Sequence, residues 1–252
     1  RGVINSWADF EKYPWPEPDK ILDYSAFEYI KKRLPDGMKI IGGCAGGVFE
    51  HISWLFGLVP FSLALYDQPD LVQAVADKVA GIVYEANKRI LQIMGDKLGA
   101  LETGDDMGFK TGTMVPPEML RKYIFPGLKK TVALAHEYKV PFILHSCGQL
   151  NRIMDDLIDD VQIDAKHSFE DVIMPVAEVK KRWGNRLAIF GGIDMDVLVR
   201  GSEDEVRKYT RRVLEQCAPG GGFALGSGNT IANYIPIKNY LAMLDEGRKF
   251  RF

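Results

Sequence analysis

A histidine and a cysteine two residues apart, His145 and Cys147, carry the most distinctive chemistry in this sequence. They end a short apolar stretch between Pro141 and Gly148 that is typical of a buried strand. Side chains two apart on a strand point to the same side, so the imidazole and the thiol can converge on one point. Imidazole nitrogen and thiolate sulfur are ligands that zinc prefers. The pair therefore predicts a metal site at a strand end, with a packed histidine beside an inert cysteine as the alternative.

Other polar and ionisable side chains also follow predicted strands. They are Glu102, Asp105, Asp106, Asp164, Lys166, His167, Glu170, Asp194, Ser227 and Asn229. Several carboxylates near an N/S pair suit a catalytic zinc ion, which takes three protein ligands and one exchangeable ligand. Such an ion acidifies a bound oxygen or sulfur, or polarises a substrate oxygen. The loop acids have an alternative role, because Asp and Asn often satisfy turn backbone or cap the next helix.

Several further polar residues have more than one possible role. An ammonium group at Lys166 must meet an anion or solvent, and a structural ion pair explains it as well as a catalytic role does. Ser227 and Asn229 lie among glycines, where the backbone bends sharply or a ligand approaches closely. The remaining histidines and cysteines are expected to pack in the structure: Cys44, His51, His136 and Cys217.

The elements that position these groups alternate in type. Strands are predicted near residues 38–43, 98–102, 140–148, 161–165, 187–190 and 221–225, and helices near residues 26–33, 48–56, 69–93, 116–138, 150–157, 172–182, 202–217 and 235–248. Asp67 is expected to cap the helix that begins at 69, Pro126 to interrupt the helix that contains it, and Ser202 with Glu205 to form a capping box. Residues 1–37 are expected to form an irregular N-terminal arm.

Strand, polar loop and helix recur six times, which is the pattern of a parallel α/β protein. Polar residues gather after the strands, where a (β/α)8 barrel holds its active site. A doubly wound sheet also binds ligands there, but no glycine-rich phosphate motif follows the first strand. We therefore predict an α/β fold of the (β/α)8 TIM-barrel type, as a single domain over residues 1–252. Six repeats are fewer than eight, so the N-terminal one or two β/α units are expected to precede Arg1, which is not an initiating Met.

Composition excludes several classes of partner. The 252 residues are 46% hydrophobic and carry a net charge of −2 with both signs interspersed, so no basic face indicates nucleic acid. Three scattered cysteines are too few for a disulfide framework, which predicts reduced thiols and a cytoplasmic location. The sequence has neither a signal peptide nor an apolar run of about 18 residues, so no membrane partner is expected.

The chain resembles the uroporphyrinogen decarboxylase superfamily, and more closely its corrinoid-linked methyltransferase branch (methyltransferase I, or O-demethylase). The resemblance covers almost the whole chain. It rests on the motifs GDDMG (104–108), MVPPEMLRKYIFPGLKK (114–130), LHSCG (144–148), IDAKHSFED (163–171), FGGIDMDVL (190–198) and GSGN (226–229). The superfamily fold is a (β/α)8 barrel, in agreement with the repeats.

The resemblance implies a zinc ion held by an HxC motif after one strand and by a cysteine after the last strand. His145 and Cys147 match the HxC motif, whereas Ser227 stands where the last cysteine is expected. We expect Glu170 to be the third ligand instead, and Glu102 and Asp194 are the next candidates. The decarboxylases of the superfamily lack the HxC motif, use no metal, and depend on an Arg-rich N-terminal motif that is absent from this chain.

We predict a zinc-dependent methyltransferase that moves a methyl group from a small methylated donor, such as a methoxylated compound, to a corrinoid (cobalamin) protein. The predicted catalytic residues are Asp106, His167 and Asp194, the predicted cofactor contacts are Asp105, Ser227 and Asn229, and the predicted zinc ligands are His145, Cys147 and Glu170. The alternatives are a tetrapyrrole decarboxylase or tetrapyrrole-binding protein that works by metal-free carboxylate and Arg chemistry, and a non-catalytic partner of a corrinoid protein. A homodimer remains open, because six repeats leave an exposed sheet edge.

Overall fold

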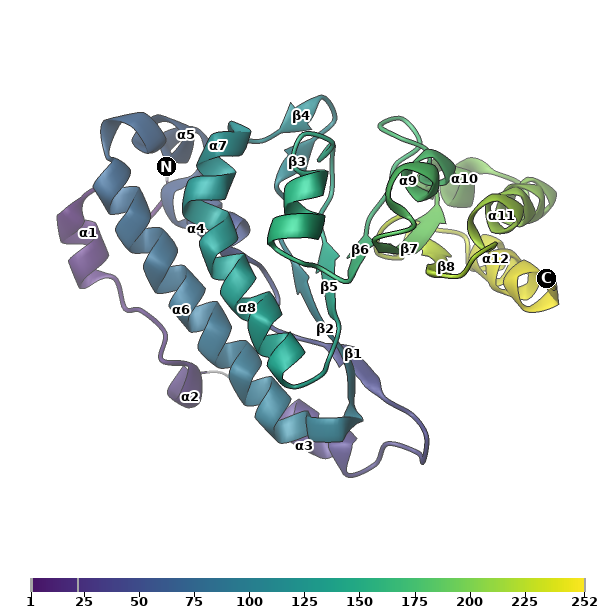
Figure 1. The fold of residues 1–252 in the computed structure, drawn as a ribbon, viewed down its shortest axis with the longest axis horizontal. Coiled ribbons are helices and arrows are strands. Elements are labelled where there is room, and N and C mark those ends of the chain that lie inside the picture. The colour runs from purple at the N-terminus through teal and green to yellow at the C-terminus, as the bar shows by residue number, and fades with distance from the viewer. Residues whose placement is uncertain (1, 22, 252) are drawn as a thin grey trace.

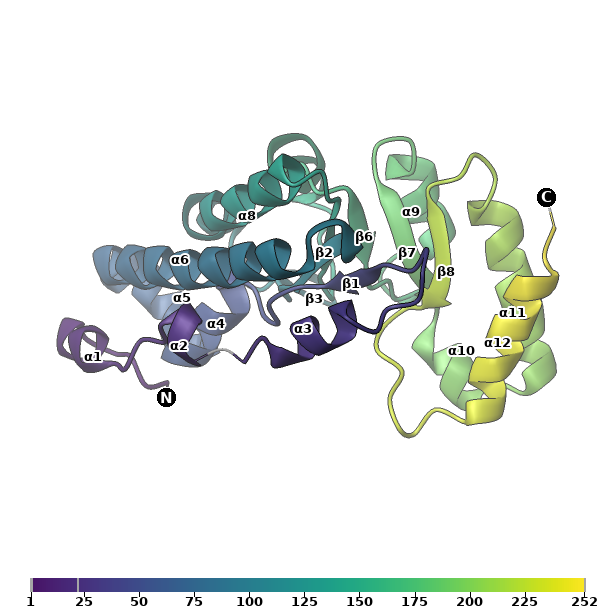
Figure 2. The ribbon, with the colours of Figure 1, turned by 90° about the horizontal axis from the view of Figure 1, so that it is seen from below.

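The central sheet of the computed structural model, which describes residues 2–21 and 23–251, has six parallel strands in the order β1-β2-β5-β6-β7-β8. They are β1 (Ile40–Gly42), β2 (Leu98–Gly104), β5 (Phe142–His145), β6 (Ala165–His167), β7 (Ala188–Ile193) and β8 (Phe223–Ser227). The sheet curls into a half-barrel (Figures 1 and 2). A small antiparallel hairpin, β3 (Gly108–Phe109) and β4 (Gly112–Thr113), follows β2. The predicted α/β class with a barrel-like parallel sheet is confirmed.

Helices cover the sheet in two groups, which lie at opposite ends of the molecule in Figure 1. The first group is α4 (Val48–Phe56), α5 (Leu58–Asp67), α6 (Pro69–Met94), α7 (Pro117–Met119) and α8 (Phe125–Glu137), and the second is α9 (Val176–Trp183), α10 (Met195–Arg200), α11 (Glu203–Cys217) and α12 (Ile237–Lys249). The long helices α6 and α8 lie side by side in both views. The N-terminal arm contains three short helices, α1 (Trp7–Lys12), α2 (Pro18–Ile21) and α3 (Ser25–Lys31).

The two faces of the sheet are packed differently. Alternation along β5 sends Phe142 and Leu144, both fully buried, into the main core with the helices. Ile143 lies on the other face and joins a small separate cluster with Ala100 and Ala165. His145 follows Ile143 by two residues, so alternation places it on this second face, above the small cluster. The site therefore lies at the carboxyl end of the lightly packed face.

Several predicted boundaries are confirmed and others are wrong. The capping box of Ser202 and Glu205 starts α11 as predicted. Pro126 lies in the first turn of α8, directly after a π-helical segment (Leu120–Ile124), so the interruption is also confirmed. Asp67 is not a cap, because it is the last residue of α5 and Gln68 precedes α6 without a side-chain hydrogen bond.

The fourth strand lies later in the chain than predicted. β6 comprises Ala165–His167, whereas the apolar residues Val161 and Ile163 pack into the main core from the preceding loop. Apolar periodicity alone does not distinguish such a loop from a strand. As a result Asp164 precedes the strand, and its carboxylate pairs with His136 Nε2 at 2.8 Å, away from the carboxyl end.

Further helical segments also differ from the prediction. Helices α1 and α2 lie in the arm that was expected to be irregular, and helices α5 and α10 were not predicted either. Helix α5 begins after Gly57, whose φ of 81° turns the chain between α4 and α5. The helix predicted near residues 150–157 is a turn followed by a π-helix (Asp156–Asp160).

Within the described part of the chain no single helix is long and apolar enough to cross a membrane. Helices α4 and α5 pass such a test only when taken together, and they meet at 95°.

Leu144 provides a test of this packing. Leu144→Ala removes a fully buried side chain on the helix-covered face, so we expect the free energy of unfolding to fall by about 3 kcal/mol. Ile41→Ala, on the edge strand β1 where the side chain is 51% exposed, should change it by less than about 1 kcal/mol. Urea unfolding measures both variants. Equal losses in the two variants would show that the faces are not packed as described.

Candidate metal centre

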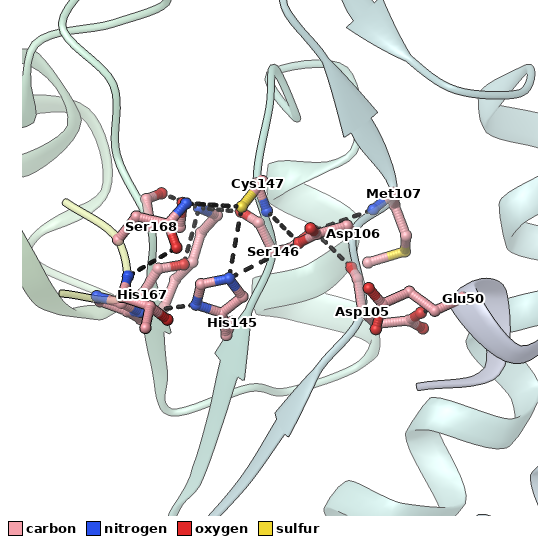
Figure 3. A network of polar contacts seen from close by, with 12 residues as sticks. Glu50, Asp105, Asp106, Met107, His145, Ser146, Cys147, His167 and Ser168 are labelled. Carbon is pink, nitrogen blue, oxygen red and sulfur yellow. Dashed lines mark hydrogen bonds and ion pairs between the residues drawn. The ribbon is translucent and has the colours of Figure 1, made fainter. Parts of the chain in front are cut away.

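Asp106, His145 and Cys147 converge at the carboxyl ends of β2 and β5 (Figure 3). Their donor atoms all lie within 4.8 Å of one another. His145 Nε2 is 3.4 Å from Cys147 Sγ and 3.8 Å from Asp106 Oδ1. The backbone N–H of Cys147 also donates to Asp106 Oδ1 at 2.7 Å. The three side chains therefore form one cluster of nitrogen, sulfur and oxygen donors.

The strand register explains this convergence. Gly104 of β2 is paired with His145 of β5. Asp106 and Cys147 each follow the paired position by two residues, so both emerge at the same level above the sheet. The HxC pair thus converges as predicted, and the carboxylate of the next strand meets it.

The geometry of this cluster fits a zinc ion. Zinc bonds of about 2.0–2.3 Å in a tetrahedron separate neighbouring donor atoms by roughly 3.3–3.7 Å. The two separations at His145 Nε2, 3.4 and 3.8 Å, are close to that range. A neutral imidazole, a thiolate and a carboxylate are ordinary zinc ligands, and three protein ligands leave one position exchangeable.

Two side chains donate hydrogen bonds to the sulfur of Cys147. Ser168 Oγ lies 3.4 Å from Sγ, and Asn229 Nδ2 lies 3.2 Å from it. Burial raises the pKa of the Cys147 thiol, and these two donors act in the opposite direction by favouring the thiolate. Asn229 was predicted to contact a cofactor, and the structure places it against the thiol.

A chain of hydrogen bonds determines the tautomer of His145. His167 Nε2 lies 3.2 Å from the carbonyl oxygen of Ser227, which only accepts, so Nε2 carries the proton. In a neutral ring His167 Nδ1 is then an acceptor, and it lies 2.7 Å from His145 Nδ1. His145 Nδ1 therefore carries a proton, and Nε2 presents its lone pair to the cluster. Burial lowers the pKa of both imidazoles, which favours these neutral forms.

Asp105 lies on the other side of the same loop, facing helix α4 in Figure 3. Its carboxyl group accepts hydrogen bonds from the backbone N–H groups of Phe49 and Glu50 at 3.2 and 2.9 Å. Burial raises the pKa of Asp105 to about 7. Its contacts connect the loop after β2 to the first turn of α4, so Asp105 caps an earlier helix of the chain and not the next helix that the sequence alternative named.

A buried ammonium group holds the neighbouring loops together. Lys166 Nζ donates to the carbonyl oxygens of Ser146, His167 and Ser168 at 3.0, 3.3 and 2.7 Å, and lies 4.4 Å from the ring centre of Phe169. The side chain is 3% exposed, and burial lowers its pKa to about 8. Lys166 was expected at a strand end, in an ion pair or a catalytic role, but it lies within β6 and binds backbone carbonyls.

The remaining predicted residues lie outside the donor cluster. Glu170, expected to be the third ligand, does not join Asp106, His145 and Cys147 and borders a small cavity beside Lys166. Both carboxylate oxygens of Asp194 accept backbone N–H groups, at Asp196 and Asp171, so it caps α10. Ser227 Oγ donates to the carbonyl oxygen of Asn229 at 2.5 Å. Glu102 lies on β2 beside Ile143, one layer below the cluster.

Sequence reasoning missed three residues that shape the site. Ser168 adopts a φ of 84°, an unfavourable backbone conformation for a serine, and it donates to the thiol. Ser146 Oγ donates to the carbonyl oxygen of Asp105 at 2.6 Å and accepts from the Met107 N–H. Glu50, in α4, donates its backbone N–H to the carboxylate of Asp105, which lies 55 residues later in the chain. No local pattern signals these roles, because each depends on contacts between distant segments.

The parallel half-barrel places the chain among α/β proteins with a barrel-like sheet, and the donor cluster at its carboxyl end could hold a metal ion. The uroporphyrinogen decarboxylase (URO-D) family model matches residues 1–250, so the chain belongs to this family. The predicted superfamily resemblance is confirmed, and methyltransferases of the superfamily are among the proteins that the chain resembles.

Named relatives fall into two groups. The uroporphyrinogen decarboxylase of Alkalilimnicola ehrlichii is 25% identical over 260 residues, covering 96% of this chain and 66% of its own. The methylated-thiol–coenzyme M methyltransferase of Methanosarcina mazei is 27% identical over 133 residues, 52% of this chain and 33% of its own. A solved methyltransferase structure from Methanosarcina mazei superposes with a TM-score of 0.73 at 20% identity, covering 89% of this chain and 62% of its own, and supports the fold. This chain thus spans just under two thirds of the length of the decarboxylase relatives.

The buried Lys166 predicts an unusual pH dependence. Its folded pKa of about 8 lies below the ordinary value of 10.5, so between these values the unfolded chain binds more protons than the folded chain. Stability contributed by this group therefore rises with pH through that window. The free energy of unfolding of the wild type should therefore rise by about 2 kcal/mol relative to that of Lys166→Met between pH 8 and pH 10.

Urea unfolding at a series of pH values measures this difference. Lys110→Met, at an exposed position in the β3–β4 hairpin, is the control and should follow the wild-type curve. A constant difference between wild type and Lys166→Met across the window would contradict the lowered pKa.

Proposed function

We propose that this chain is a zinc-dependent methyltransferase that passes a methyl group between a small methylated donor and the corrinoid of a partner protein. The observation that carries the proposal is the cluster of Asp106, His145 and Cys147 at the carboxyl end of the half-barrel. Membership of the URO-D family and similarity to a methylated-thiol–coenzyme M methyltransferase support it. The donor, the partner and a cytoplasmic location are parts of this proposal.

The proposal assigns a task to each residue of the site. A zinc ion bound by Asp106, His145 and Cys147 would act as a Lewis acid on the heteroatom that carries the methyl group. His167 holds the Nε2 lone pair of His145 toward the cluster through the shared Nδ1 hydrogen bond. Ser168 and Asn229 orient the sulfur of Cys147 and favour its ionised form. Such supporting contacts typically raise metal affinity by about 10- to 100-fold.

A second candidate function is decarboxylation of a tetrapyrrole. It is favoured by relatives named uroporphyrinogen decarboxylase, which are 25% identical to this chain over more than nine tenths of its length. This reaction would not need the donor cluster to hold a metal. Metal content and the two enzymatic reactions therefore separate the candidates.

Metal content tests the ligand assignment first. We expect about one zinc ion per chain in protein purified under reducing, chelator-free conditions, and loss of zinc in His145→Ala and Cys147→Ser, because each variant removes a donor. Asp106→Asn should weaken zinc binding at least tenfold, whereas Glu170→Gln, outside the cluster, should retain zinc. Elemental analysis gives the stoichiometry, and competition with a chromogenic chelator gives the affinity. Full zinc in Asp106→Asn together with loss in Glu170→Gln would restore the sequence-based assignment.

Methyl transfer tests the function itself. Free cob(I)alamin serves as acceptor, with dimethyl sulfide and methoxybenzene as alternative donors, and its consumption is followed by absorbance. We expect transfer from at least one donor by the wild type, transfer at the protein-free rate by Cys147→Ala, and wild-type transfer by Glu170→Gln. Release of CO2 from uroporphyrinogen by the wild type and equally by Cys147→Ala, without methyl transfer, would support the decarboxylase instead.

A further inference from the structure

A second, separate cavity lies between the N-terminal arm and helices α4 and α6. It encloses about 480 Å³, and its walls include Tyr13, Trp15, Cys44, His51 and Trp54. None of the described residues that line it is Asp, Glu, Lys or Arg, and the rest of the lining is apolar. Small-molecule sites are typically concave, mostly apolar and provided with few polar groups. This cavity has the size and lining of such a site and is unsuited to a charged ligand.

Aromatic rings are arranged in two edge-to-face pairs around the cavity. Tyr13 and Trp15 have ring centres 4.7 Å apart at 65°, and His51 and Trp54 have ring centres 5.1 Å apart at 61°. Trp54 is 62% exposed, so one of these rings also borders solvent. Flat aromatic molecules pack well against such rings, in stacked or edge-on geometry. The walls therefore favour a planar aromatic ligand.

His51 supplies a hydrogen-bond acceptor of defined position. Its Nδ1 lies 2.7 Å from the carbonyl oxygen of Gly47, which only accepts, so Nδ1 carries the proton. In the neutral ring Nε2 then has a lone pair, and no hydrogen bond to Nε2 from the described residues is present. The nearby Cys44 thiol contributes no charge, because burial raises its pKa. A ligand in this cavity that carries an O–H or N–H group can donate it to His51, which is one of the lining residues.

Two consecutive glycines, Gly46 and Gly47, lie between His51 of the cavity and Asp105 of the loop after β2. A side chain at Gly46 would meet the ring of His51, with its Cβ 2.5 Å from Cε1, and a side chain at Gly47 would lie 2.2 Å from the Asp105 carboxyl carbon. The two glycines thus pack His51 on one side and Asp105 on the other. The cavity shares no lining residue with the donor cluster of Asp106, His145 and Cys147.

We propose that this cavity binds an uncharged planar aromatic ligand that donates one hydrogen bond to His51 Nε2 and packs against Trp15 and Trp54. The site is distinct from the metal centre and does not depend on the proposed methyl transfer.

The test uses a matched pair of probes, 2-naphthol and 2-methylnaphthalene, which differ in one hydrogen-bond donor. Calorimetric titration of the purified chain at pH 8 should give saturable 1:1 binding of 2-naphthol, about tenfold tighter than that of 2-methylnaphthalene. His51→Phe keeps a ring but removes the acceptor, so it should lower the affinity for 2-naphthol about tenfold and leave 2-methylnaphthalene unchanged. Trp54→Ala should weaken both probes, and Trp7→Ala, outside the cavity, neither.

Three results would overturn this assignment. They are absence of saturable binding by both probes, an unchanged preference for 2-naphthol in His51→Phe, and loss of 2-naphthol binding in Cys147→Ser, which would move the ligand to the metal centre. Thermal unfolding of His51→Phe and Trp54→Ala checks that both variants are folded. Zinc content is measured on the same samples, which separates the two proposals. Binding of 2-naphthol without zinc would contradict the proposed function but support this aromatic-ligand site.

Discussion

The hydrogen-bond register between β2, β5 and β6 determines every contact in the donor cluster. It aligns Gly104 with His145, and His145 with His167, so the two imidazoles meet side by side and Asp106 rises beside Cys147. A slip of one residue would turn His145 to the helix-covered face, because side chains alternate along a strand. The main core prevents that slip, since Phe142 and Leu144 would then leave it. Packing on one face of β5 thus positions chemistry on the other.

Backbone contacts made by buried side chains hold the loops above this register. Lys166 ties together the carbonyl groups of Ser146, His167 and Ser168, and Ser146 connects the loop after β5 to the loop after β2. Burying an ammonium group costs free energy, and so does a serine at a φ of 84°. Both unfavourable features lie next to Cys147. The Lys166 contact and the backbone conformation of Ser168 place the Ser168 hydroxyl against the sulfur. Contacts within the chain therefore hold these loops in position.

Local rules in the sequence predicted most of the fold and the centre of the site, but not its third donor. Alternation and small-residue turns indicate where parallel strands end, and the i, i+2 spacing brings His145 and Cys147 together. Asp106 was predicted at the site as an acid, yet its place beside Cys147 depends on which residue pairs with His145, and register is a property of two strands. The same limit explains Glu170, which the superfamily resemblance favoured but whose loop turns toward Lys166. Helix α5 escaped prediction because its nine residues from Leu58 to Tyr66 carry no charge and no polar cap.

An oxygen donor in the third position changes the chemistry of the proposed centre. Thiolate sulfur is a soft ligand that passes electron density to a metal ion, whereas carboxylate oxygen is harder. A thiolate, a carboxylate and a neutral imidazole bring two negative charges in total, which would balance the two positive charges of a zinc ion. Ser227 does not complete the set, because its hydroxyl donates to Asn229 and its carbonyl holds His167. One sulfur and one oxygen would leave a more electrophilic ion than two sulfurs would, which suits a methyl donor whose heteroatom leaves poorly without assistance.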